Sequence, residues 1–305
     1  MTVFSKLDPD IITFHILPNL DGKSLIILSS VSSQFHSLIS KINNNSDLWR
    51  NICISTWPSL FTNFQKQDFH SIISILLGGY RTFFLDAFPS IHPPLNNPLP
   101  LLPPKLFFFY AVDIFLHGEQ QPFYSLHGAQ MVFTYSEYYS HPLLDPPIFK
   151  FELCHREAAE MNFIKVKKEG CLEYLKQKLS FNCVAIDPKG IKRAGSLFTN
   201  NGCNCKAVLA KRVILGVEVL FETVLPVPAG LSNLYTEMIK CRVEVMCRWE
   251  GEGEEEDKLR VRFVCLTMKD MNGKPLLERD GAAVILNAIQ NGVRRGTNTL
   301  TQLVS

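Results

Sequence analysis

Three stretches of the sequence hold side chains that do chemistry in many proteins. In CHREAAE, His155 and Glu157 lie two positions apart, and a histidine near a carboxylate can transfer protons. Cys203 and Cys205 form a close pair of thiols, and thiolates bind zinc. The segment from Glu250 to Asp257 holds six acids in eight residues, which could attract a basic partner or a loose cation.

None of these stretches has the neighbours that its chemistry requires. No nucleophile or orienting group accompanies His155 and Glu157, so a solvated surface is the simpler interpretation. Zinc sites use C-x-x-C pairs or cysteines with well-spaced histidines, and C-N-C fits neither, so thiols in a loop are expected. An acidic run at a hairpin tip is usually just solvated. We therefore predict no catalytic residue, no metal site and no cofactor.

Short catalytic motifs are also absent from the sequence. Neither G-x-x-x-x-G-K-[ST] nor a G-x-G-x-x-G that opens a helix occurs, which argues against nucleotide binding. H-E-x-x-H and G-x-S-x-G are missing too, which argues against zinc peptidases and serine hydrolases. The lack of enzyme signatures directs the question toward binding.

Composition limits the class of protein. A chain of 305 residues exceeds the usual length of one domain, so two compact units, or one large unit with an appendage, are expected. A net charge of +2 gives no basic footprint for nucleic acid. No apolar run is long enough to span a membrane, and the N-terminus lacks the pattern of a secretory signal. Nine scattered cysteines indicate free thiols in a reducing compartment, so we expect a cytoplasmic or nuclear protein, or both, with no membrane partner.

Helix signals dominate residues 7–87. Asp8 is a good N-cap and Pro9 suits a first helical position, which predicts a helix over Pro9–Leu17 that Pro18 ends. Asp21 caps the next predicted helix. The helices predicted after Asp21 cover residues 22–30, 32–39 and 48–60. Residues 69–88 are expected to add one or two more helices, separated by Gly78 and Gly79.

The first predicted helix is apolar on more than one side. Its apolar residues form two sets. Ile12, Ile16 and Leu20 lie on one face, and Ile11, Phe14 and Leu17 point away from that face. A helix that is apolar on several sides must be buried on several sides. We therefore expect something outside this small unit, which could be another protein, to cover the second face.

Residues 89–104 separate this helical part from the rest of the chain. Seven prolines lie between Pro89 and Pro104, a composition that neither helix nor sheet interior tolerates. A linker between units is the main interpretation, and a polyproline ligand or extended strap is the alternative.

Strand patterns begin at about residue 105. The clearest predicted strand, 240–249, alternates apolar and charged residues, as expected for a half-buried antiparallel strand. A second strand should complete the hairpin, with Leu259, Val261, Phe263 and Cys265 facing the same interior. Further strands are predicted within 111–126, 149–153 and 180–198, and helices over 169–180 and 280–292, the last capped by Asp280 and stopped at Gly292.

The predicted class is α+β, with a helical module followed by a mainly antiparallel, sandwich-like β domain that carries one or two short helices. The predicted divisions are residues 1–88 for the module and its helical extension, 89–104 for the linker, 105–296 for the β domain and 297–305 for a tail.

The N-terminal segment combines residue types at fixed spacing. They are Leu7, the pair Pro9-Asp10, the apolar spacing of Ile12, Ile16, Leu17 and Leu20, Asp21 with Leu25, Val31-Ser32 before Phe35, and Leu48-Trp49-Arg50. With this combination the segment resembles an F-box, the adaptor-binding motif of SCF-type ubiquitin ligases. Many members begin Leu-Pro, whereas Asp8 intervenes here. The stretch after this segment is similar to that of plant F-box proteins, and the strand-rich remainder is faintly similar to a phloem-lectin-like β-sandwich.

This resemblance implies a non-catalytic substrate receptor. It would dock on a Skp-type adaptor, which links it to a cullin scaffold, and residues 105–296 would hold an unknown client protein. The adaptor-binding residues that it implies are Leu7, Pro9, Ile12, Ile16, Leu17, Leu20, Leu25, Val31, Phe35 and Trp49. The alternative for each is a place in an ordinary helical core. Two other functions stay open, a scaffold outside a ligase and a ligand-binding or sugar-binding β domain.

Overall fold

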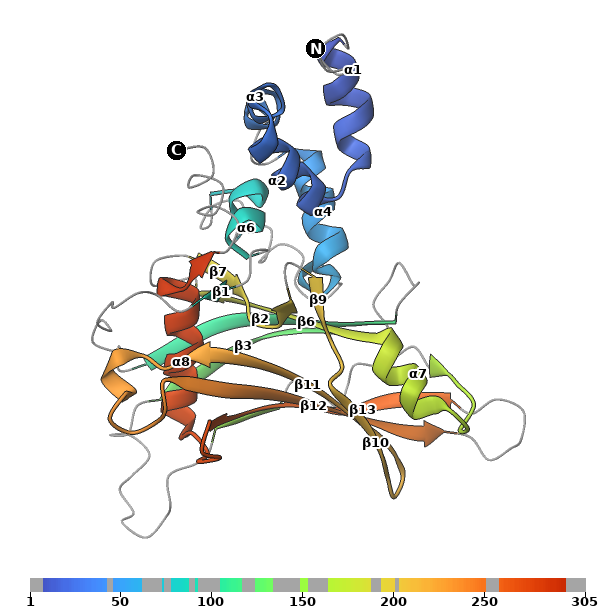
Figure 1. Cartoon of the computed structure of the whole chain (residues 1–305), viewed down its shortest axis with the longest axis vertical. Coiled ribbons are helices and arrows are strands. Elements are labelled where there is room, and N and C mark those ends of the chain that lie inside the picture. Colours follow the sequence, from blue (N-terminus) through green and yellow to red (C-terminus); the bar gives the residue numbers. More distant parts are fainter. Residues whose placement is uncertain are drawn as a thin grey trace.

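The computed structural model has helices at one end and a larger strand-rich part at the other (Figure 1). It describes residues 8–42, 46–61, 73, 78–87, 91–92, 105–116, 124–133, 149–152, 164–187, 193–200, 203–250 and 258–294. The predicted α+β class is confirmed. The predicted linker, apart from 91–92, and the predicted tail lie outside the described residues, so the domain boundaries stay a prediction.

Local capping explains where the N-terminal helices begin. The Asp8 carboxylate accepts from the Asp10 N–H at 2.9 Å, and that of Asp21 accepts from the Ser24 N–H at 2.6 Å, which confirms both predicted caps. The helical elements of this part are α1 (Pro9–Ile11), η2 (Ile12–Ile16), η3 (Leu17–Asn19), α2 (Gly22–Val31), α3 (Ser33–Lys41), α4 (Asp47–Thr56), η4 (Pro58–Phe61) and α6 (Tyr80–Ala87).

The first helix differs from the prediction in its winding and its end. A π turn, η2, follows α1, and the 3-10 turn η3 carries the helix on to Asn19. The prediction that Pro18 ends the helix was wrong, because Pro18 lies near the start of η3, where its missing N–H is not needed.

Two antiparallel sheets form the strand-rich part. In the first, β2 (Lys105–Leu116) lies between β3 (Tyr124–Phe133) and β6 (Leu179–Asp187). The strands that continue this sheet beyond β6 are β7 (Arg193–Ser196), β8 (Thr199–Asn200) and β9 (Cys203–Lys206).

The second sheet is built on three long neighbours. They are β11 (Gly216–Pro226), β12 (Met238–Glu250) and β13 (Lys258–Asp270). The flanking strands are β10 (Leu209–Val213) on β11, and β4 (Lys150–Glu152) and β5 (Ile164–Lys165) on β13. The other elements are β1 (Ile91–His92), which pairs with β14 (Val293–Arg294), η6 (Ala229–Leu231), α7 (Cys171–Lys178) and α8 (Glu278–Asn291).

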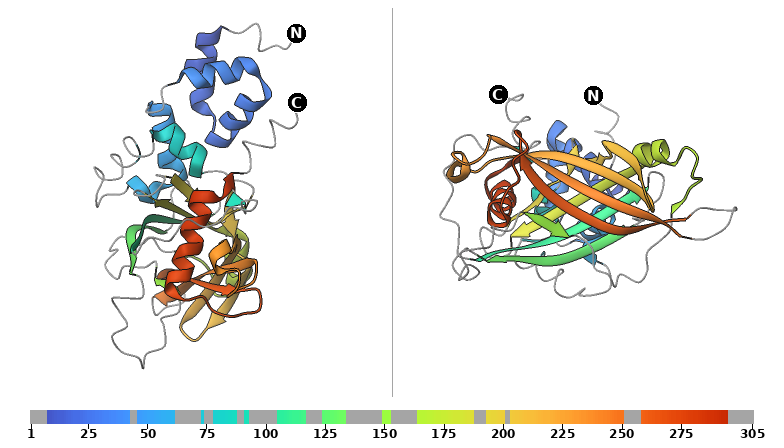
Figure 2. Two further views of the ribbon diagram at one scale, coloured as in Figure 1. Left: turned by 90° about the vertical axis from the view of Figure 1, so that its left-hand side faces the viewer. Right: turned by 90° about the horizontal axis from the view of Figure 1, so that it is seen from below.

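The main core fills the space between the two sheets. Alternate side chains of β2 and β6 meet those of β11 and β12, as in the pair Phe181 and Phe221, whose ring centroids are 5.3 Å apart. Helix α8 closes one side of this sandwich and lies between the two layers in Figure 2. It is apolar nearly all round, and Ala282 through Ile289 are all buried.

The predicted hairpin is present, with one correction to its second strand. Cys241, Val243, Val245 and Cys247 of β12 point inward as predicted, and Trp249, predicted to share their face, is partly buried against the same core. In β13, Val261 pairs with Cys247 but Phe263 pairs with Met246, so Arg262 is an extra residue in a β-bulge. Beyond the bulge Val264 and Leu266 face the core, and the prediction for Phe263 and Cys265 was wrong because a one-residue bulge reverses the alternation.

Helix α8 also departs from its predicted start. It begins at Glu278, after Leu277, and Asp280 lies in its first turn instead of capping it. The Asp280 carboxylate is buried and accepts from the Tyr235 hydroxyl at 2.7 Å. Its end before Gly292 is as predicted.

A second core joins the helical part to the outer face of the first sheet. Side chains of β2 and β6 that point away from the sandwich, including Ala111, Val184 and Ile186, pack in one cluster with Trp57 and Phe84. The first sheet is therefore buried on both faces, which accounts for its nearly continuous apolar strands.

Candidate functional site

The predicted adaptor-binding residues divide into buried and exposed groups. Those buried in the core of the helical part are Ile12, Leu17, Leu25, Phe35 and Trp49. Ile16 and Leu20 are half-buried, and Pro9 and Val31 are exposed. Leu7 lies outside the described residues. The buried group supports the module from within, where a partner cannot reach it without opening the fold.

The π turn explains part of this division. In an α-helix Ile12, Ile16 and Leu20 would share a face, as their spacing in the sequence predicts. A π turn hydrogen-bonds residues five apart, here the Leu17 N–H to the Ile12 carbonyl. Ile12 and Leu17 therefore enter the core together, and Ile16 and Leu20 remain half-buried.

Two pairs of large apolar side chains stay exposed on the helical part. Ile11 and Phe14, three positions apart, are 45% and 70% exposed on the first helix. Ile27 and Val31, one turn apart on α2, are 50% and 67% exposed. Each pair forms an apolar strip that the module's own core does not use. We call these four residues the exposed apolar strips.

The sequence indicated only part of these strips. Ile11 and Phe14 were expected to lie away from the main face of the first helix, yet they were not among the predicted adaptor-binding residues. Ile27 was missed altogether. The signal was available in the run Leu25-Ile26-Ile27-Leu28, because four consecutive apolar residues cannot all fit one face of a helix.

An aromatic cluster packs two other helices of this part against each other. Trp57 contacts both Phe83 and Phe84, with ring centroids 5.0 and 5.6 Å apart, and Trp49 contacts Phe84 at 5.8 Å. These pairs combine large apolar burial with favourable ring geometry. They tie α4 to α6, so the strips sit on a packed scaffold.

Polar contacts attach this scaffold to the first sheet. The Asn182 amide donates to the Thr56 carbonyl at 3.3 Å. Arg193 donates twice to Asp86, at 2.6 and 2.9 Å, and the Ala194 N–H donates to the same carboxylate at 2.6 Å. Since α6 carries Asp86 and β7 carries Arg193, this ion pair links the two parts of the molecule directly.

The other predicted chemical stretches give no catalytic geometry in the described part of the chain. Cys205 is buried, and burial raises its pKa, while the side chain of Cys203 is outside the described residues. His155, Glu157 and residues 251–257 are also outside them. Among the described residues, no three His, Cys, Asp or Glu side chains gather as a metal site would need. A helix with the length and apolarity to cross a membrane is likewise not found in the part of the chain described.

The fold and the exposed apolar strips together define the class of protein. The chain is an α+β protein in which a small helical module with exposed apolar strips precedes a larger antiparallel β domain. No protein-family model matches the chain, and no solved structure matches it.

The chain is similar to curated plant proteins. Three proteins of Arabidopsis thaliana match, all named as F-box proteins, the first as a probable one. They are 29%, 28% and 27% identical over 303, 294 and 295 residues. The matches cover 96%, 95% and 95% of this chain, and 76%, 74% and 80% of the relatives. They support assigning the chain to the plant F-box proteins, with a C-terminal domain of unassigned type.

Proposed function

We propose that this protein is a substrate-receptor subunit of an SCF-type ubiquitin ligase. The helical module docks on a Skp-type adaptor, which connects it to a cullin scaffold. The β domain holds a client protein for ubiquitination. The chain itself carries out no transfer chemistry, which belongs to other subunits of the ligase.

The exposed apolar strips carry this proposal. Phe14 and Val31 are 70% and 67% exposed although the core of the module is filled by other apolar residues. Burying one such side chain in an interface is worth about 1.5–3 kcal/mol. A handful of well-packed residues usually supply most of the free energy of a protein interface.

The attachment of the module to the sheet supports the receptor role. A packed second core and the Asp86–Arg193 ion pair hold the β domain in one orientation relative to the strips. A client held by the β domain would therefore stay at a set distance from the adaptor. Fixed geometry of this kind raises the effective concentration of one bound partner near the other.

The direct test changes the strips without touching the core. In the double variant Phe14→Gln and Val31→Gln, a purified Skp-type adaptor should bind at least about tenfold more weakly, because both changes remove apolar contact area. Leu234→Gln is the matched control, since Leu234 is 54% exposed but lies in the β domain. Isothermal titration calorimetry measures affinity, and circular dichroism checks that the variants remain folded. A folded double variant with normal adaptor affinity would refute the docking proposal.

An experiment in cells distinguishes the receptor role from the scaffold alternative. Removing residues 7–52 would strip Trp49 and Ile52 from the second core, so the surface double variant is the better tool than truncation. Cells that express it should accumulate the client with fewer ubiquitin chains. Unchanged client abundance and ubiquitination would favour a scaffold that acts outside a ligase.

A further inference from the structure

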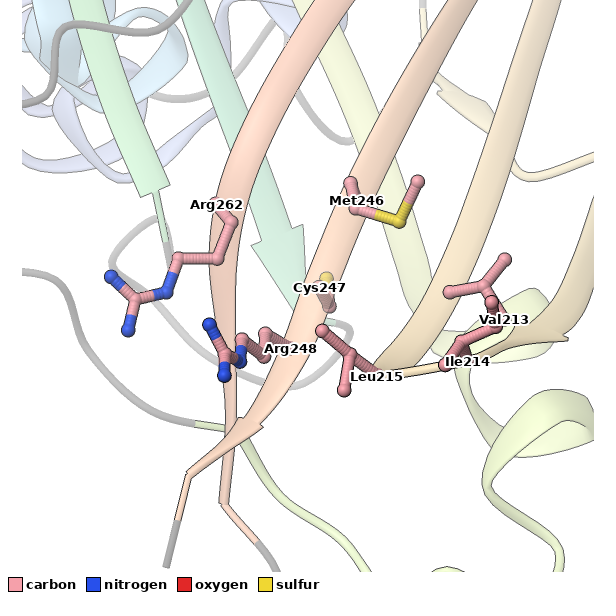
Figure 3. Close-up of a pocket in the computed structure, with 7 residues that line it drawn as sticks. All are labelled: Val213, Ile214, Leu215, Met246, Cys247, Arg248 and Arg262. Atoms are coloured by element: carbon pink, nitrogen blue, oxygen red, sulfur yellow. The ribbon is translucent and has the colours of Figure 1, made fainter.

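A surface hollow of ≈ 700 Å³ lies on the second sheet beside the turn between β10 and β11. Its lining residues, shown in Figure 3, are Val213, Ile214, Leu215, Met246, Cys247, Arg248 and Arg262. Figure 3 shows the turn residues on one side of the hollow and the two guanidinium groups on the other. The hollow thus has an apolar wall and a cationic wall.

The apolar wall is unusual for a hairpin turn. Val213 pairs with Gly216, so Ile214 and Leu215 alone form a two-residue loop. Such loops favour Asn, Asp and Gly, because these residues adopt the required backbone conformation and tolerate water. Here Ile214 is 100% and Leu215 is 60% exposed. The turn does not need apolar residues at these two positions, and their side chains do not pack in the core. A bound partner that covers them would explain why they are apolar.

The cationic wall comes from β12 and β13. Arg262 is the extra residue of the β-bulge, and its guanidinium donates to the Glu250 carboxylate. Bulges re-aim side chains in this way and often lie beside functional sites. Arg248 is exposed and contacts no carboxylate among the residues that the structure describes. Its guanidinium can therefore form two parallel hydrogen bonds with a carboxylate or phosphate from a partner.

The hollow lies far from the helical module. Figure 1 shows the β10–β11 turn at the opposite end of the molecule from α1, α2 and α3. A partner in the hollow would therefore leave the exposed apolar strips free. This separation is what a protein that joins two partners needs.

We propose that the hollow is the client-docking site and that it binds a peptide segment with a large apolar side chain next to an acidic one. The proposal rests on the receptor function proposed above and names the chemistry of its client. The apolar side chain packs on Ile214, Leu215 and Met246. The acidic group pairs with Arg248 and, by drawing Arg262 away from Glu250, with Arg262.

The test selects peptides without assuming a client. Phage-displayed random peptides are selected on the immobilised full-length protein and then measured by fluorescence anisotropy. The expected result is enrichment of Asp or Glu beside Leu, Ile, Met or Phe. Synthetic versions of an enriched peptide with the acid changed to the amide should bind about tenfold more weakly, and a version with phosphoserine distinguishes phosphate from carboxylate as the anion.

Two variants test the two walls separately. Ile214→Asn with Leu215→Gly installs a favoured turn, so the hairpin keeps its fold while the apolar wall disappears. Arg248→Gln removes one cation of the other wall. Each should weaken peptide binding by at least about tenfold, whereas the controls Val224→Thr and Lys269→Gln, exposed on β11 and β13 outside the hollow, should leave it unchanged.

Several results would overturn the proposal. They are enrichment of peptides without this composition, failure to enrich any peptide, normal binding by either wall variant, and displacement of the peptide by single-stranded RNA at lower concentration than by an acidic peptide. The adaptor titration is run on the same proteins. Wall variants should keep normal adaptor affinity, and the double variant of the strips should keep peptide binding, so failure of either proposal is seen independently.

Discussion

Ser59 donates two hydrogen bonds to the Asp113 carboxylate, from its backbone N–H at 3.1 Å and from its hydroxyl at 2.8 Å, although the residues are 54 positions apart. Ser59 lies in η4 and Asp113 in the C-terminal half of β2, so the pair joins the helical part to the first sheet. The Ser125 hydroxyl of β3 donates to the same carboxylate. Burial raises the pKa of Asp113 to about 7, although the hydrogen bonds from Ser125 and Ser59 act in the opposite direction.

This shift predicts a pH dependence of stability. The folded-state pKa of Asp113, about 7, exceeds the ordinary value of 3.8, so the folded protein binds this proton more tightly than the unfolded chain does. The stabilisation is fully present below about pH 4 and is lost as pH rises through about 7, at up to about 1.4 kcal/mol per pH unit. Urea unfolding from pH 5 to pH 8 measures it.

Asp113→Asn is the variant that isolates this effect, because it keeps the shape of the side chain but cannot ionise. The difference in unfolding free energy, wild type minus variant, should fall as pH rises from 5 to 7. All other titrating groups cancel in the difference. A difference that stays constant over this range would show that Asp113 does not titrate there.

The ion pair between α6 and β7 should stabilise the attachment of the helices to the sheet. Asp86→Asn removes the charge that Arg193 and the Ala194 N–H share, and we expect a loss of about 1–2 kcal/mol, because the pair is only partly exposed. The control is Glu173→Gln on α7, whose carboxylate is exposed and bonds Gln177 within the same helix. Chemical denaturation followed by tryptophan fluorescence compares the two. Equal losses in both variants would contradict a special role for Asp86.

Two residues of α2, two positions apart, should distinguish the core from the docking surface. Leu25 is fully buried and Ile27 is half exposed on the same helix. Leu25→Ala should lower the unfolding free energy by about 2–5 kcal/mol, since it leaves a cavity, whereas Ile27→Ala should change it by less than about 1 kcal/mol. Thermal unfolding by calorimetry measures both. Similar effects of the two changes would mean that the exposed strip on α2 is part of the core.

Replacing Gly216 or Gly273 with alanine should destabilise the fold to different extents. A Cβ at Gly216 would lie 1.9 Å from the Cys247 carbonyl oxygen, so Gly216→Ala must push β11 away from β12. At Gly273, with φ +87°, a Cβ would meet nothing within 4 Å, so Gly273→Ala carries only the backbone penalty of about 1–2 kcal/mol. Gly216→Ala should be the more destabilising, by about 3 kcal/mol or more. Urea denaturation ranks them, and the reverse order would contradict the close packing at the β10–β11 turn.

The sequence by itself determined the features that depend on neighbouring residues. Asp8 and Asp21 cap their helices by bonding N–H groups two or three positions away, so the start of each helix follows from local residue types. The inward set of β12 is equally local, because alternate side chains of one strand must face opposite sides. The F-box resemblance rests on the same kind of short-range spacing.

The tertiary structure alone decided which apolar residues of the first helix are core and which are free. Leu17 and Phe14 are equally apolar in the sequence, yet one is fully buried and the other 70% exposed, because a π turn and the packing of neighbouring helices select the buried face. The tertiary structure also decided where the β-bulge at Arg262 lies and that Ser59 bonds Asp113. It likewise assembled the hollow from the β10–β11 turn, β12 and β13. These features depend on contacts between residues far apart in the chain. The spacing of neighbouring residues does not specify which distant segment will pack against them.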